Sequence, residues 1–243
     1  MTITRVAIIG LGLLGGSIGL AVTERAPEIA TTGWDRDPDV RGKAGTRNLV
    51  GTVCATAAEA VANADLIILC VPVGAMEAAA RDLAPHLPAD AIISDVGSSK
   101  KSVLDALGAA LPRQTIIPAH PVAGTEHSGP EAGFATLFAG RWCSLTPPAN
   151  VDAAAVDALS DFWTKLGAKV ELMDPEHHDL VLAVTSHIPH LIAFTIVGTA
   201  SDLEDVTRSE VIKYSAGGLR DFTRIAASAP VMWRDVFGNT KGA

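Results

Sequence analysis

A histidine at the end of an apolar segment is the first residue of this sequence whose position suggests chemistry. The segment that begins at Thr115 is rich in isoleucine and ends at His120, and a predicted turn with Pro121 and Gly124 follows. In an open α/β sheet, side chains at the carboxyl ends of strands lie on the edge where ligands bind. We therefore predict that His120 is the chemical centre, with a cofactor site built by the chain before it and a substrate site by the chain after it.

Further polar side chains are concentrated downstream, on a segment that is otherwise apolar. Six of the seven histidines lie between His120 and His190, and Ser186 and His187 fall in the same short stretch as His190. Buried imidazoles need hydrogen-bond partners. We therefore predict that Ser186, His187 and His190 line a polar cleft.

No metal site is predicted from these histidines. His178 and His187 are nine residues apart, about 2.5 turns of a straight helix, and are expected to face opposite sides. Pro189 stands between His187 and His190 and is expected to kink the helix. No acidic or cysteine residue stands at the spacing of zinc ligands.

A glycine-rich turn near the start of the chain predicts a dinucleotide site. It follows the β-branched segment Val6–Ile9 and opens a predicted helix. Its glycines allow a tight turn, close approach of a pyrophosphate and close packing of helix on strand. Asp35 ends the next predicted strand about twenty residues later, where an acid binds the adenosine ribose. The predicted cofactor contacts in the turn are Gly10, Gly12, Leu13, Leu14 and Gly15.

The residues at the end of this second strand favour NAD over NADP. The carboxylate of Asp35 disfavours a ribose phosphate by repulsion. Arg36 follows it, and an arginine there can stack on adenine, pair with a ribose phosphate, or remain a solvated surface charge. We predict NAD as the cofactor, with NADP also accepted.

Two more strand ends are predicted to reach the same edge. The strand Asp65–Val71 stops at a proline, which leaves a short apolar wall for the nicotinamide or the adenosine. The strand Ala91–Asp95 leads into a turn with Ser98, Ser99 and two lysines. Either serine can instead cap the next helix, and the lysines can be a solvated helix start. The predicted cofactor contacts here are Val71, Pro72, Val73, Asp95 and Gly97.

The elements that must position these residues alternate between strand and helix up to residue 173. This alternation is typical of a doubly wound parallel sheet of the Rossmann type. Asp174-Pro175-Glu176 then has the composition of a helix start, and only helices are predicted beyond it. The expected fold is α/β, with a dinucleotide-binding domain at 1–173 and a smaller all-helical domain at 174–243. The expected later strands are 50–53, 115–120, 142–147 and 169–173, and the expected helices are 57–64, 76–87, 103–111, 151–166, 177–200, 204–214 and 217–225.

Composition restricts the classes of partner. The formal net charge of -8 argues against nucleic acid, which needs a basic face. The three cysteines are scattered and the N-terminus lacks a signal-peptide layout, which predicts a cytoplasmic protein. No apolar run approaches the roughly 20 residues of a membrane span, so no membrane partner is expected.

Segments in a fixed order make the sequence similar to the prephenate/arogenate dehydrogenase family of tyrosine biosynthesis. The glycine turn at 10–17 and the segment Asp95–Ser98 belong to this pattern, but the glycine turn is shared with many dehydrogenases. The later segments are more specific, and the resemblance covers nearly the whole chain. These segments are His120–Gly129, Thr185–His190, Arg220–Ala226 and Met232–Asp235.

The resemblance implies both an architecture and a reaction. An N-terminal dinucleotide-binding domain would precede a helical domain that forms a homodimer. The reaction would be the NAD-dependent oxidative decarboxylation of prephenate or arogenate to 4-hydroxyphenylpyruvate or tyrosine. Family members continue with more helices after the segment Met232–Asp235, whereas this chain ends at Ala243, so the helical domain is expected to be shorter than usual.

The resemblance also implies roles for individual residues. His120 would accept the proton of the substrate's ring hydroxyl, for which an ordinary imidazole pKa of about 6.5 is suitable, and Ser98 would hold that hydroxyl. Arg224 would grip a substrate carboxylate in a bidentate manner; its alternative role is a salt bridge to Asp221. The other positions that match the family's substrate cleft are Glu126, His178, Ser186, His187, His190, Asp221 and Trp233.

Two other functions stay open from the sequence. One is a dehydrogenase of similar architecture that acts on a small β-hydroxy acid, although that chemistry usually uses a lysine where this chain has His187 and His190. The other is a non-catalytic dinucleotide-binding module. No residue of the sequence distinguishes prephenate from arogenate.

Overall fold

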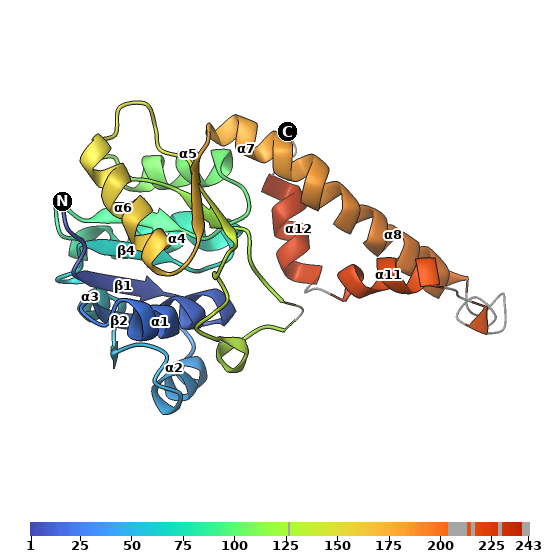
Figure 1. The fold of residues 1–243 in the computed structure, drawn as a ribbon, viewed down its shortest axis with the longest axis horizontal. Coiled ribbons are helices and arrows are strands. Elements are labelled where there is room, and N and C mark those ends of the chain that lie inside the picture. The colour runs from blue at the N-terminus through green and yellow to red at the C-terminus, as the bar shows by residue number, and fades with distance from the viewer. Residues whose placement is uncertain (126, 204–212, 215–216, 228–229, 240–243) are drawn as a thin grey trace.

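The computed structural model shows an α/β body from which a long helix extends (Figure 1). It describes the chain except for residues 126, 204–212, 215–216, 228–229 and 240–243. The side chains at 218, 220–223, 230–232 and 239 also lie outside the description. Two later helices fold back along the extension toward the body (Figure 1).

The body is built on a parallel sheet with strand order β3-β2-β1-β4-β5-β6. The order reverses between β1 and β4, and a doubly wound sheet binds its ligand in the crevice at such a point. The predicted fold class is thereby confirmed. The strands are β1 (Arg5–Ile9), β2 (Ala30–Trp34), β3 (Thr52–Val53), β4 (Leu66–Leu69), β5 (Ile92–Asp95) and β6 (Thr115–Ile116).

Both faces of this sheet are covered by helices, which explains its nearly continuous apolar strands. On β1, Val6 and Ile8 pack into one core and Ala7 and Ile9 into the other. The helix α2 was not predicted, although Asp37 caps it by accepting a hydrogen bond from the backbone of Asp39. The helices of the body are α1 (Leu13–Arg25), α2 (Pro38–Thr46), α3 (Ala57–Val61), α4 (Met76–Leu83), α5 (Lys101–Ala110) and α6 (Ala153–Lys165).

The strand predicted at 115–120 is in fact two strands in two sheets. The backbone N–H of Ile117 donates to Ile93 of β5, but Pro118 has no N–H to continue the ladder. The chain leaves the large sheet there, and β7 (Ala119–Pro121) pairs antiparallel with β8 (Trp142–Leu145). The strand β9 (Lys169–Leu172) completes this second sheet. His120 therefore lies in the small sheet, beside the end of β5.

The helical part begins where the sequence predicts. The carboxylate of Asp174 accepts hydrogen bonds from the backbone of Glu176 and His177. The predicted kink at Pro189 is replaced by a π-turn just before it, which widens the helix and gives the ring room that a regular helix lacks. The parts are α7 (Pro175–Leu182), the π-turn (Ala183–His187) and α8 (Ile188–Asp202), followed by α11 (Gly217–Ala226) and α12 (Pro230–Asn239).

These last two helices return along the extension. α11 packs against α8, and α12 contacts the 3-10 turn Val73–Ala75 of the body. The helix α12 was not predicted. The helix predicted at 204–214 falls largely outside the described residues.

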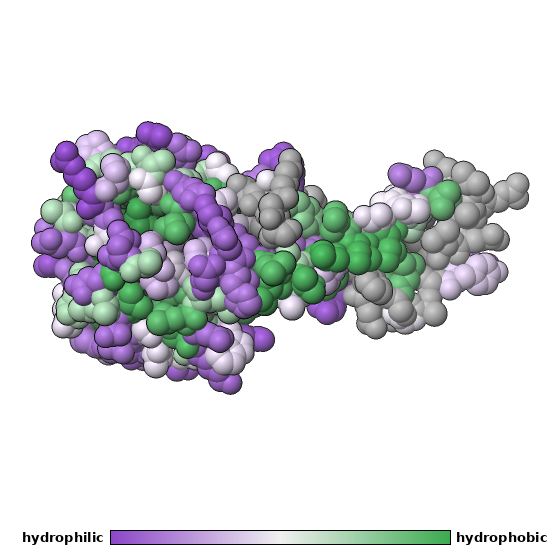
Figure 2. All heavy atoms as spheres, turned by 90° about the horizontal axis from the view of Figure 1, so that it is seen from above, coloured by the Kyte–Doolittle hydropathy of each residue, from purple (hydrophilic) through white to green (hydrophobic). Residues whose placement is uncertain are grey.

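The extension is more apolar and longer than the sequence analysis expected. Among the described residues, the helix Pro175–Asp202 has the length and composition of a membrane span, with a hydropathy of 1.9 and only 17% of the window buried. No single apolar run predicts this length, because the helix continues through Pro189 and several scattered polar residues. Figure 2 shows hydrophobic surface along this extension. The exposed apolar residues at helical spacing are Leu180, Val184, Ile188, Leu191 and Ile192.

Candidate active site

His120 is buried on β7, where the small sheet meets the end of β5. Its side chain is 9% exposed, and its Nδ1 lies 2.9 Å from Nε2 of His178 on α7. The two rings meet edge to face, with centroids 5.1 Å apart. The predicted centre of the site is thus in direct contact with the helical part of the chain.

His178 is in turn fixed by its sequence neighbour. Nδ1 of His178 lies 2.9 Å from Oδ1 of Asp179. That carboxylate also accepts hydrogen bonds from the backbone N–H groups of Lys100, at 2.7 Å, and Lys101, at 3.0 Å, at the start of α5. Burial raises the pKa of Asp179, but the hydrogen bonds from His178 and the two amides outweigh it, so the pKa lies below its ordinary value.

Two sequence predictions are corrected by these contacts. His178 was predicted to bind substrate, but it is fully buried and both ring nitrogens already contact protein groups. Ser98 and Ser99 were alternative caps for α5, but the helix has no side-chain cap of that kind and its first amides donate to Asp179. His178 and His187 were expected to face opposite sides of a straight helix. Both are buried instead, because the π-turn after α7 changes the helical phase.

Lys100 is not a solvated residue but part of a fully buried ion pair. Its Nζ lies 2.6 Å from Oδ2 of Asp95 and 2.6 Å from the carbonyl oxygen of Ala119. Asp95 also accepts from the backbone of Gly97 and Ala119. Burial raises the pKa of Asp95 and lowers that of Lys100, and their attraction opposes both effects. Asp95 was predicted to contact the cofactor, but its side chain instead ties β5 to β7.

The surroundings of His120 keep its ring neutral. Burial is the largest effect, and the positive charge of Lys100 adds to it; together with His178 and His187 they lower the pKa of His120 well below 6.5. A neutral imidazole can accept a proton. Burial likewise lowers the pKa of His187.

These two lowered pKa values predict that the fold loses stability in mild acid. Below its ordinary pKa of 6.5 each histidine is protonated in the unfolded chain but not in the folded one, so the free energy of unfolding falls as the pH decreases from about 6.5 toward the folded pKa. Urea unfolding at pH 7.5, 6.5 and 5.5 measures this. Equal free energies of unfolding at the three pH values would contradict it, and His120→Asn should make the dependence shallower.

Beyond His120 the helical part presents polar atoms that have no hydrogen-bond partner among the described residues. Both ring nitrogens of His187 and Nε1 of Trp233 are buried without a hydrogen bond, and His187 is 3% exposed. The ring of His190 stacks on Trp233 at 3.7 Å, and its Nδ1 donates to the carbonyl oxygen of Ser186. Because buried polar atoms normally have partners, these groups fit the wall of a ligand site.

Four further predicted site residues are not placed in this contact network. Arg224 lies on α11 with its side chain exposed. Asp221 lies on the same helix, but its side chain is outside the described residues, as is all of Glu126. Ser98 is half-buried in the loop between β5 and α5.

The glycine turn has the shape that a pyrophosphate requires. Gly10 has a φ of +100°, and a Cβ on Gly15 would stand 1.9 Å from the carbonyl oxygen of Gly10, so neither position tolerates a side chain. A Cβ on Gly12 would meet nothing within 4 Å. The first turn of α1, which contains Leu13 and Leu14, has no acidic residue and no side-chain cap, so its amides suit an anionic group.

The remaining predicted cofactor residues surround this turn. Asp35 accepts hydrogen bonds from the backbone of Leu11 and Asp37, one on each oxygen, and retains lone pairs for ribose hydroxyls. Arg36 is exposed beside it. At the end of β4, Pro72 is exposed and Val71 and Val73 are half-buried. The residues present therefore fit a bound NAD.

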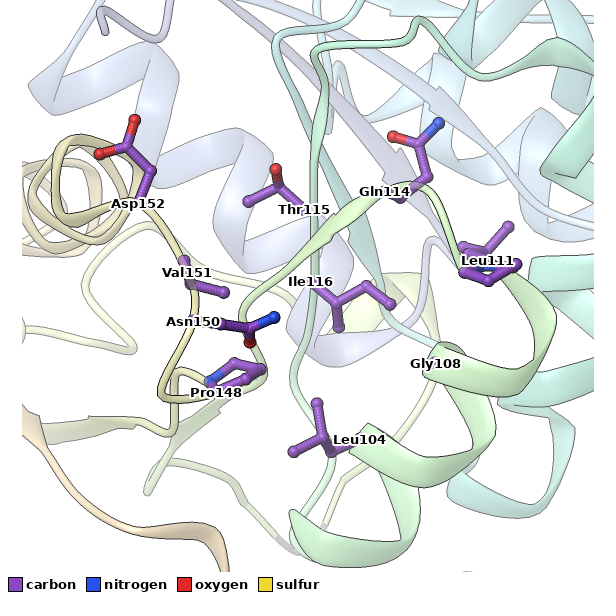
Figure 3. Close-up of a pocket in the computed structure, with 11 residues that line it drawn as sticks. Leu104, Gly108, Leu111, Gln114, Thr115, Ile116, Pro148, Asn150, Val151 and Asp152 are labelled. Carbon is purple, nitrogen blue, oxygen red and sulfur yellow. The ribbon is translucent and has the colours of Figure 1, made fainter.

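A pocket of about 530 Å³ lies elsewhere on the body, as Figure 3 shows. It is formed by the end of α5, by Thr115 and Ile116 of β6 and by the loop before α6. Its acidic residue, Asp152, caps α6 through the backbone N–H of Ala154. This pocket contains none of the predicted site residues.

Sequence reasoning missed two residues that hold His120 in place, Asp179 and Lys100. Asp179 had a local signal, because it directly follows the adjacent histidines His177 and His178 on a helix. Lys100 had none, since a lysine at a helix start is normally exposed.

Both parts of the chain match known family models. Residues 18–172 match the model described as "Prephenate dehydrogenase, nucleotide-binding domain", and residues 174–243 match "Prephenate dehydrogenase, dimerization domain". The chain is 45% identical to a cyclohexadienyl dehydrogenase of Zymomonas mobilis, over 97% of this chain and 81% of that protein. It is 34% identical to a prephenate dehydrogenase of Bacillus subtilis, over 97% of this chain and 64% of that protein.

Solved structures of prephenate and arogenate dehydrogenases are also similar to this chain. A prephenate dehydrogenase from Aquifex aeolicus, in complex with hydroxyphenyl propionate and NAD+, superposes with a TM-score of 0.91 at 32% identity, over 99% of this chain and 84% of that one. The Synechocystis arogenate dehydrogenase has a TM-score of 0.81 at 25% identity, over 98% and 84% of the two chains. The similarity extends over both the α/β body and the helical extension.

Proposed function

The chain belongs to the prephenate dehydrogenase family of NAD-dependent oxidoreductases in tyrosine biosynthesis, and we propose that His120 is the general base of its oxidative decarboxylation. The observation that carries this proposal is the position and state of His120. It is a buried imidazole kept neutral by its surroundings, and it lies where the nucleotide-binding body meets the helical part.

The reaction type suits a single neutral imidazole. Prephenate is a cyclohexadienol with two carboxylates. Bound NAD supplies the acceptor for the hydride that leaves the hydroxyl-bearing ring carbon. His120 takes the hydroxyl proton as that carbon becomes a carbonyl. The ring carboxylate then leaves as carbon dioxide, its bonding electrons make the ring aromatic, and His120 returns the proton to the phenolate oxygen.

The unpartnered polar atoms of the helical part are proposed to face the rest of the substrate. Within the part of the chain that the structure describes, both ring nitrogens of His187 and Nε1 of Trp233 are buried without a hydrogen-bond partner, and His190 is held beside them by its stacking on Trp233. Ser98 is proposed to hold the ring hydroxyl. Glu126, Ser186 and Asp221 are proposed as further contacts to the substrate, on the family match alone.

Arg224 is proposed to bind a substrate carboxylate, and its replacement gives a specific expectation. Its side chain is exposed, and a guanidinium can form two parallel hydrogen bonds with a carboxylate. Arg224→Ala should raise the KM for substrate about 10-fold or more, because a charge-assisted pair contributes roughly 1.5–3 kcal/mol, with less effect on kcat. Initial-rate kinetics measure both values. An unchanged KM would remove Arg224 from carboxylate binding; Arg234→Ala, in another exposed arginine, is the control.

The experiment that tests the proposed function uses purified protein with NAD. NADH formation is followed first with prephenate and then with arogenate, which carries an amino group in place of the keto group. Turnover of either supports the proposal, and the ratio of the two kcat/KM values decides the preferred substrate. Failure with both, or faster turnover of a small β-hydroxy acid, would reject it. The 45% identity to a protein named cyclohexadienyl dehydrogenase supports this class of ring substrate.

We also propose that two copies associate through the helical part, with the domain boundary at Met173. The exposed apolar face along α7 and α8, from Leu180 to Ile192, needs a cover, and residues 174–243 match a dimerization domain. The buried or partly buried polar groups His178, Asp179 and His187 on the same helix suit a subunit interface beside an active site better than lipid.

All three cysteines are free thiols, which supports a cytoplasmic location.

A further inference from the structure

Three side chains from two parts of the fold form a hydrogen-bonded chain that ends at the proposed base. Oδ1 of Asp179 contacts Nδ1 of His178, and Nε2 of His178 contacts Nδ1 of His120, each at 2.9 Å. We propose that Asp179 and His178 are positioning residues that set the tautomer of His120, so that the lone pair on its Nε2 faces the substrate. The inference rests on the proposed function for the identity of the proton that this lone pair accepts.

The direction of each hydrogen bond follows from the chemistry of the groups. An ionised carboxylate only accepts, so Nδ1 of His178 must carry the proton in the bond to Asp179. A neutral His178 then has a bare Nε2, which can only accept, so Nδ1 of His120 must carry a proton. A neutral His120 therefore has its lone pair on Nε2. Any other neutral arrangement breaks one of the two bonds.

The carboxylate that starts this chain is itself held rigidly. Asp179 accepts hydrogen bonds from the backbone N–H groups of Lys100 and Lys101, at the positive end of α5. It is 4% exposed and His178 is fully buried, so water does not compete for these bonds. The same contacts join the helical part to the nucleotide-binding body, and this ties the orientation of the base to the docking of the two parts.

The arrangement also favours the protonated state that His120 passes through. When His120 takes a proton on Nε2, its Nδ1–H becomes a stronger donor to His178, whose own Nδ1–H points to the negative charge of Asp179. These hydrogen bonds therefore stabilise the protonated His120 more than the neutral one. Loss of the hydrogen bonds that link Asp179, His178 and His120 should therefore affect kcat more than substrate binding.

Kinetics of matched variants test the positioning role. Asp179→Ala and His178→Leu should each lower kcat by about 10- to 100-fold, the loss that follows when the hydrogen-bond partner that orients a metal-ligating histidine is removed, with KM within about threefold. His178→Gln should recover most of the loss, because a glutamine amide can donate to Asp179 and accept from His120. Asp174→Ala removes a cap from the same helix but none of the hydrogen bonds between Asp179, His178 and His120, and should leave kcat unchanged. A normal kcat in His178→Leu, or a Gln variant as slow as the Leu variant, would overturn the proposal.

A second measurement does not depend on activity. Long-range proton–nitrogen NMR spectra of the full chain with 15N-labelled histidine distinguish the two neutral tautomers, and His120→Asn and His178→Gln assign the signals. We expect Nδ1–H for both residues in the wild type and a shift of His120 toward Nε2–H in His178→Leu. Nε2–H at His120 in the wild type would overturn the proposal even if the enzyme turns over prephenate. The expected tautomers without turnover would instead reject the proposed function alone.

Discussion

Replacing His120 with asparagine should reduce kcat for NADH formation by about 10²- to 10⁴-fold, the usual contribution of a general base. Asparagine keeps an N–H that can donate to His178 in place of Nδ1, but it has no lone pair of comparable basicity at the position of Nε2. The ring is neutral in the wild type because burial and Lys100 lower its pKa, so the variant loses an active base and not a dormant one.

Binding of NAD should be nearly unchanged in the same variant. The glycine turn and Asp35 belong to the large sheet, whereas His120 lies in the small one. Steady-state kinetics measure kcat, and titration calorimetry measures the Kd for NAD. His86→Asn, in an exposed histidine outside the site, is the control. A rate near that of the wild type for His120→Asn would exclude His120 as the base.

Lys100→Met should destabilise the fold by about 3–5 kcal/mol, the usual result of removing one partner from a buried ion pair. Both side chains are fully buried with a separation of 2.6 Å. Methionine resembles the lysine stem in volume, so the loss is mainly electrostatic. The carboxylate of Asp95 would remain in the core, where the backbone N–H groups of Gly97 and Ala119 donate to it.

Urea unfolding measures this effect, and the neighbouring lysine supplies a matched control. Lys101 pairs with Asp105 at the surface, where the side chains are 45% and 62% exposed, so Lys101→Met should change stability by less than about 1 kcal/mol. The double variant Lys100→Met/Asp95→Asn should recover part of the loss, because it removes the unpaired charge. Equal effects of the two single lysine variants would contradict the burial of the Lys100–Asp95 pair.

The sequence by itself determined the parts of this protein whose signals are local. The glycine turn, Asp35 and the alternation of strands and helices predicted a dinucleotide-binding sheet, because turn geometry and strand patterning depend on neighbouring residues. The cap at Asp174 was found for the same reason, whereas His120 lies within β7 of the small sheet and not at the end of the predicted strand. Local signals failed at Pro118, where one missing N–H divides a single apolar run between two sheets, and at Pro189, where a π-turn replaces a kink.

Only the tertiary structure decided how His120 is held. Asp179 lies 79 positions from Lys100 in the chain, and His178 lies 58 positions from His120, so no periodicity or spacing connects them. The contacts exist because α7 docks on the start of α5, where the orphan amides of the helix need an acceptor and a carboxylate can be buried. Burial then acts on the charge states: it lowers the pKa of Lys100, an effect that the attraction of Asp95 opposes, and it keeps His120 neutral. A residue's protonation state depends on everything packed around it, which the order of residues alone does not specify.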